Sequence, residues 1–200
     1  MSRVLRRTPL VLACAASLVA CEKPDAAGNG TRVVDSTGAA ASSSPATVPA
    51  APVLTDANIM AMLDQAHAAD SATGAIAAAR GANEDVNVFG RRMMRDHHAL
   101  RVGGEAIATS GNISPVLRAG DDAGARVAAL GDSLTVMPRG AAWDRFYLDE
   151  AVMHHEQALA TAQAGAAAAQ NPELKAMIAK VAAILQRHLD RAKLLRANMG

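Results

Sequence analysis

Apolar residues recur every three or four positions in four segments of the chain, each about 25 residues long. This spacing places them on one face of a helix and predicts four amphipathic α-helices, over residues 56–80, 84–109, 141–169 and 172–198. The aligned positions are Ile59, Leu63, Ala66, Asp70, Thr73 and Ala77 in the first segment, Val86, Phe89, Met93, His97 and Leu100 in the second, Leu148, Val152, His155 and Leu159 in the third, and Leu174, Met177, Val181, Ile184, His188 and Leu195 in the fourth.

Residues that favour helix ends flank these segments. Thr55 and Asn83 can cap the first two helices, and Gly81 can end the first. Asn171 followed by Pro172 is a strong start signal for the fourth helix. The long connection over residues 114–140 is expected to hold a short helix near residues 121–130. Together these signals predict an all-α fold, an antiparallel four-helix bundle with a short extra helix between helices two and three.

Composition supports this fold class and excludes several kinds of function. Alanine supplies 48 of the 200 residues and the aromatic residues only four, which favours helices over a β-sandwich or barrel. The 20 basic and 19 acidic residues form no one-sided basic stripe, so no nucleic-acid partner is expected. Both cysteines lie within the first 21 residues, which excludes a Cys-x-x-Cys zinc site in the body of the chain.

The N-terminal segment has the pattern of a secretory signal. Three arginines in the first seven residues precede an apolar run over residues 9–20 that is too short to span a bilayer. The tetrad Leu18-Val19-Ala20-Cys21 resembles the lipobox of bacterial lipoproteins, which implies cleavage before Cys21 and lipidation of its thiol. An ordinary signal with a chance cysteine is the alternative.

These features divide the chain into three parts: a lipoprotein signal peptide (1–20), the lipidated cysteine with an Ala/Ser/Pro-rich disordered linker (21–54), and the bundle (55–200). A lipid anchor makes the membrane the expected partner, and the sequence leaves any protein partner unknown. The expected location is the bacterial cell envelope, with the domain facing the periplasm and the outer membrane favoured over the inner one.

One polar residue interrupts each apolar stripe near the middle of its helix: Asp70, His97, His155 and His188. Mid-helix positions of an antiparallel bundle share one layer, so these side chains are expected to converge in the core. Buried without partners they would cost several kcal/mol, so they need each other, water or a metal. One carboxylate and three imidazoles are a plausible ligand set for one divalent ion, Zn²⁺, Cu²⁺ or Fe²⁺.

Further polar residues lie beside these four positions. Asp96, His154 and Glu156 are adjacent in sequence to the predicted ligands and are candidates to orient them by hydrogen bonds. His67 and His98 are expected to face outward or to lie beside the site. The alternative to a metal site is a buried Asp–His hydrogen-bond network that only fixes the register of the helices.

Residues from about 55 to 199 resemble a bacterial envelope family known as domain of unknown function 4142. The matching motifs are Arg92-Met93-Met94-Arg95-Asp96-His97, Trp143-Asp144-Arg145-Phe146-Tyr147, Val152-Met153-His154-His155-Glu156, Asn171-Pro172-Glu173-Leu174-Lys175 and His188-Leu189-Asp190-Arg191-Ala192. The resemblance implies a ferritin-like four-helix bundle in the envelope, and His97, His155 and His188 match histidines that recur in the family. Asp70 stands where the family usually has Glu, and His154 where it has an acid.

A looser likeness links the chain to the domain of unknown function 305, whose paired histidines and nearby methionines are associated with metal handling. His154-His155 is similar to that pair. No histidine has Glu three residues before it, which argues against di-iron chemistry, and no nucleotide-binding or nucleophile motif appears. The sequence therefore favours a non-enzymatic role and leaves two hypotheses: a metal-binding envelope module, or a structural or stress-related envelope protein with a buried polar network.

Overall fold

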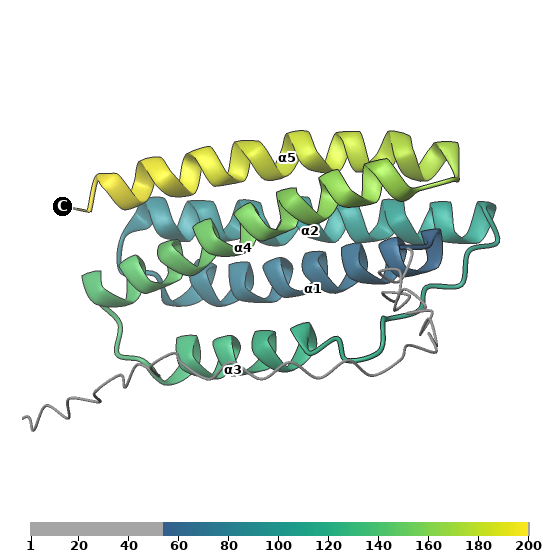
Figure 1. Cartoon of the computed structure of the whole chain (residues 1–200). Helices are drawn as coiled ribbons and strands as arrows, with labels where there is room; N and C mark the ends of the chain where they lie inside the picture. The colour runs from purple at the N-terminus through teal and green to yellow at the C-terminus, as the bar shows by residue number, and fades with distance from the viewer. Residues whose placement is uncertain (1–53, 200) are drawn as a thin grey trace, which may run out of the picture. The chain divides into compact units, whose positions relative to one another are not determined.

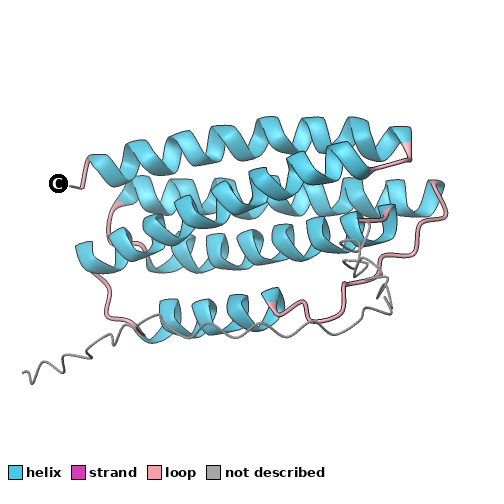
Figure 2. Cartoon of the chain, viewed as in Figure 1, coloured by secondary structure: helices cyan, strands magenta, loops and turns pink. Residues whose placement is uncertain are grey.

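The computed structural model describes residues 54–199, which form helices and loops without strands (Figures 1 and 2). The helices are α1 (Asp56–Arg80), α2 (Glu84–Ser110), α3 (Ala123–Val136), α4 (Ala141–Ala168) and α5 (Pro172–Ala197). The predicted fold class is confirmed, and the four long helices begin and end within one residue of their predicted bounds. No helix within residues 54–199 has the length and apolar character that a membrane crossing requires.

The predicted N-caps are formed by side chains that accept backbone N–H groups. Thr55 accepts the N–H of Asn58, whose side chain in turn accepts the N–H of Thr55, and this pair forms a capping box. Asn83 and Asn171 accept N–H groups from the first turns of α2 and α5. These caps are local, which explains why the sequence located the helix starts so closely.

The short connecting helix differs from its prediction, because α3 begins two residues later and continues six residues further. Asp121 lies before the helix, and its carboxylate accepts the N–H of Ala123, the first residue of α3, at 2.9 Å. At the other end, Leu134 is fully buried, and its carbonyl oxygen accepts the indole N–H of Trp143 at 2.8 Å. Packing against α4 therefore extends α3 beyond the length that local signals indicated.

The connection that contains α3 runs along the length of the bundle (Figure 1). As a result α2 and α4 run in the same direction, while the hairpins α1–α2 and α4–α5 are each antiparallel. The helix pairs α2–α5 and α1–α4 close the bundle, and α3 packs on α1. One long crossover between two hairpins is the connectivity of ferritin-type bundles.

Two aspartates join the hairpins at opposite ends of the bundle: Asp144, which is buried, and Asp56, which is half-buried. The carboxylate of Asp144 on α4 accepts the N–H groups of Ala82 and Asn83, in the α1–α2 turn, at 2.9 Å each. At the other end, Asp56 on α1 accepts two N–H groups of the α4–α5 turn, at 2.8 and 2.9 Å. These paired contacts fix the hairpins lengthwise and so set which residues share the middle layer.

The core consists of two apolar clusters separated along the bundle. One includes Phe89, Trp143 and Tyr147, and the other includes Ile59, Leu174 and Ile178. On every long helix at least one buried polar residue lies between the positions that these two clusters use; these residues are His67, Asp70, Thr73, His97, His155 and His188. The layer predicted from the four stripes is therefore present within the described bundle.

Candidate metal centre

Three histidines from three helices meet in this layer: His97 of α2, His155 of α4 and His188 of α5. Each is at most 1% exposed, and one ring nitrogen of each lies within 4.8 Å of the others. Nε2 of His97 and Nδ1 of His188 are 3.2 Å apart. Two nitrogens bound to one tetrahedral Zn²⁺ at 2.0–2.1 Å would be about 3.3–3.4 Å apart. His97 and His188 therefore have the spacing that a shared divalent cation requires, and the three rings, hereafter the histidine triad, could hold one.

Two members of the triad are oriented through their second nitrogen. Nδ1 of His155 donates to the carbonyl oxygen of Ala151 at 2.8 Å, which leaves a lone pair on Nε2. Nε2 of His188 lies 2.9 Å from Oδ2 of Asp96 and donates to it, which leaves the lone pair of Nδ1 facing His97. Hydrogen bonds of this kind fix the tautomer of metal-binding histidines. Asp96, a predicted supporting residue, is thus hydrogen-bonded to His188.

Asp70 lies on the side of His97 that faces away from His188. Its Oδ2 is 3.6 Å from Nδ1 of His97, the nitrogen that faces away from His188. Helix α1 packs directly against α2 through Gly74 and Gly90, and this close approach brings Asp70 next to His97. The structure brings together the three predicted histidines and places the predicted carboxylate behind one of them.

His67 is a part of the layer that the sequence did not assign to the site. It is fully buried, and its Nδ1 lies 3.1 Å from Nδ1 of His97. The sequence predicted that His67 and His98 would either face outward or lie beside the site. His67 lies beside the site, and His98 is exposed. The signal was available, because His67 precedes Asp70 by three residues and such residues share one face of a helix.

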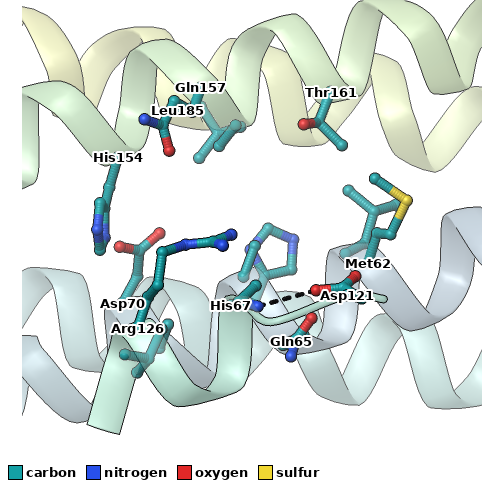
Figure 3. A pocket seen from close by; sticks show the side chains of 16 residues that line it. Met62, Gln65, His67, Asp70, Asp121, Arg126, His154, Gln157, Thr161 and Leu185 are labelled. Carbon is teal, nitrogen blue, oxygen red and sulfur yellow. Dashed lines mark hydrogen bonds between the residues drawn. The ribbon is translucent and has the colours of Figure 1, made fainter. Parts of the chain in front are cut away.

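His154 and Glu156 flank His155 in sequence but point away from the triad. His154 is half-buried with Nε2 at 3.9 Å from Glu150, and it faces a cavity that Asp70 also lines (Figure 3). Glu156 is exposed and its Oε1 lies 2.7 Å from Nζ of Lys193. Successive helical residues differ by about 100° in direction, so neighbours of an inward histidine turn outward.

Two imidazole nitrogens in the layer are buried without a hydrogen-bond partner, Nε2 of His155 and Nε2 of His67. A buried polar atom left unpaired costs about 1–3 kcal/mol. Nε2 of His155 is the atom that the triad leaves free once Nδ1 is bound to Ala151. A cation held by the triad would satisfy it.

Burial keeps the triad uncharged at neutral pH. Loss of hydration lowers the pKa of His155 to about 4 and lowers the pKa of His97, where neighbouring imidazoles add to the effect. Burial also lowers the pKa of His188, although the hydrogen bond to Asp96 opposes this change. Neutral imidazole is the form that binds metals, so protons compete for these nitrogens only below the ordinary pKa of 6.5. Burial raises the pKa of Asp70 to about 7.

A family model described as domain of unknown function, DUF4142, matches residues 39–195. The chain belongs to this family. No curated protein and no solved structure gave a significant match to the chain. The DUF4142 match extends from before α1 to within the last turns of α5, so the whole triad lies inside the DUF4142 domain. The resemblance found in the sequence motifs of α2, α4 and α5 is thereby confirmed.

Proposed function

We propose that the DUF4142 domain of this protein binds one divalent transition-metal ion through Nε2 of His97, Nε2 of His155 and Nδ1 of His188. The observation that carries the proposal is that Nε2 of His155 is buried and unpaired in a ring of which one nitrogen lies within 4.8 Å of a nitrogen of each other ring. Its tautomer is set by Ala151, so the free position holds a lone pair. Three imidazole donors suit Zn²⁺, Cu²⁺ or Fe²⁺.

The surroundings of the triad support this ligand set. With a cation in place, every second nitrogen keeps its proton and has an acceptor: Ala151 for His155, Asp96 for His188, and Nδ1 of His67 for His97. Such outer partners typically accompany metal-binding histidines. We assign the site to sequestering or carrying the ion and propose no reaction for it.

A second candidate function is structural, and one observation favours it. Asp96, His188, His97 and His67 form a continuous chain of contacts of 2.9, 3.2 and 3.1 Å. With a proton on Nε2 of His97, this chain is a hydrogen-bond network that would fix helix register without a metal. It leaves Nε2 of His155 unpaired, and the metal site is therefore the better-supported function.

Metal analysis and thermal melting of the untagged full chain in detergent test the proposal. After dialysis against Zn²⁺, Cu²⁺ or Fe²⁺, we expect one bound ion per chain for at least one of the three metals. At a free concentration 100 times Kd, binding adds about 2.7 kcal/mol of stability, or roughly 5–10 °C in Tm. A chelator should reverse the change. No bound ion and no rise in Tm with any of the three metals would favour the structural network.

We further propose that the domain is held at the envelope membrane by a lipid on Cys21. The basic start, the apolar run and the sequence Leu18–Cys21 support this, and all of them lie outside the described residues. In fractionated cells, Cys21→Ser should move the protein from the membrane to the soluble periplasmic fraction. The matched variant Cys14→Ser should stay in the membrane fraction. Retention of Cys21→Ser in the membrane would refute the anchor.

A further inference from the structure

The histidine triad is closed off from solvent, since each of its residues is at most 1% exposed. An ion bound there must therefore enter through some other part of the domain. A cavity of about 210 Å³ lies beside the layer, between α1, α3 and α4 (Figure 3). Its polar lining comes from the α1, α3 and α4 regions and includes His67, Asp70, Asp121, Arg126, His154 and Thr161.

The inner wall of this cavity touches the triad. His67 and Asp70 both line it, and both contact Nδ1 of His97, at 3.1 and 3.6 Å. Nε2 of His67 is buried and has no hydrogen-bond partner. An imidazole nitrogen and a carboxylate oxygen directly behind a metal ligand are donors that a divalent cation accepts.

The outer part of the cavity also suits a cation. Figure 3 shows His154 and Asp70 pointing toward each other across it, while Arg126 extends into it from α3. The guanidinium of Arg126 is paired with the carboxylate of Asp122, which offsets its positive charge. Asp121 adds a second carboxylate to the lining.

Two other approaches to the triad are less suited to a cation. A larger cavity of about 490 Å³ between α1 and α2 also reaches His67, but Asp70 does not line it, and its Asp64 and Arg101 pair with each other at 2.7 Å. On the α2–α5 face, Asp96 is occupied by His188 and by the guanidinium of Arg92, at 2.9 and 3.4 Å.

We propose that the α1–α3–α4 cavity is the entrance by which a divalent cation reaches the triad, with Asp70 and Nε2 of His67 as its transient ligands. This inference rests on the proposed metal-binding function. A route does not alter the equilibrium between free and bound ion. Obstructing it must therefore slow uptake and release by the same factor.

Cavity-filling variants of the full chain test the entrance. Ala66 on α1 and Ala158 on α4 are half-buried and line this cavity, whereas half-buried Ala108 on α2 lines only the larger one. Ala66→Met and Ala158→Met add an unbranched side chain that helices tolerate, and Ala108→Met is the matched control. Rates of Zn²⁺ uptake and release are measured by stopped flow with a fluorescent indicator, and Kd by equilibrium dialysis.

We expect Ala66→Met and Ala158→Met to slow uptake and release about tenfold or more while Kd changes less than about threefold. Ala108→Met should match the wild type in all three quantities. Wild-type rates in both cavity variants, or slowing in Ala108→Met instead, would overturn the entrance while leaving the metal site intact. A wild-type chain that binds no Zn²⁺, Cu²⁺ or Fe²⁺ at equilibrium would instead overturn the proposed function, and the entrance with it.

Discussion

Replacing His155 by phenylalanine is expected to weaken cation binding at least ~100-fold, because loss of a supporting partner alone typically costs 10–100-fold and His155 supplies a ligand. The ion-free protein should remain folded. Phenylalanine fills a similar volume and removes Nε2, which is buried and unpaired. Removing an unpaired buried polar atom offsets the lost bond to Ala151, so the free energy of unfolding should change by no more than about 1–2 kcal/mol.

Equilibrium dialysis against the metal that the wild type binds, with urea unfolding of the ion-free proteins, measures both quantities. Exposed His98→Ala and half-buried His154→Ala are the controls, since neither residue belongs to the triad. Both should bind like the wild type. Unchanged affinity in His155→Phe, or an equal loss in the His154 control, would contradict the assignment of ligands.

The second large effect is expected for Gly90→Ala, at the contact between α1 and α2. A Cβ at residue 90 would lie 2.5 Å from the nitrogen of Ala78 and 2.7 Å from the carbonyl oxygen of Gly74. Both are main-chain atoms, so the helices would have to separate. Overpacking costs about 1–3 kcal/mol and can exceed the gain of about 1 kcal/mol in helix propensity. We expect a net loss of about 1–2 kcal/mol.

Gly103→Ala on the same helix is the matched control. A Cβ at residue 103 would meet nothing within 4 Å, and the residue is exposed. It should therefore gain stability, by up to about 1 kcal/mol, from helix propensity alone. Urea unfolding of both variants measures the difference. Equal stability of the two would show that α1 and α2 do not depend on this close approach.

Much of the fold could be predicted because its signals are local. Thr55, Asn83 and Asn171 bind N–H groups two or three residues away, so a short stretch of sequence contains the whole helix start. The end of α3 could not be predicted in this way. It depends on Leu134 and Trp143, which come together only when α3 packs on the bundle.

The candidate site was predictable in part, for a related reason. Apolar periodicity shows which face of a helix is inward, and this brought His97, His155 and His188 into one layer. It does not fix how closely two helices approach, so it could not show that Asp70 meets the far nitrogen of His97. His67 was not assigned because α1 is rich in alanine, and a stripe of small residues has no clear edges.

The most direct test of the metal site is anomalous diffraction from crystals of the domain grown with the metal that it binds. Data collected on both sides of the absorption edge of that metal locate the ion independently of the protein atoms. For Zn²⁺ the account predicts one peak in the layer, about 2.0–2.1 Å from Nε2 of His97, Nε2 of His155 and Nδ1 of His188. A peak confined to surface residues such as His98, or a triad that holds only water, would contradict it.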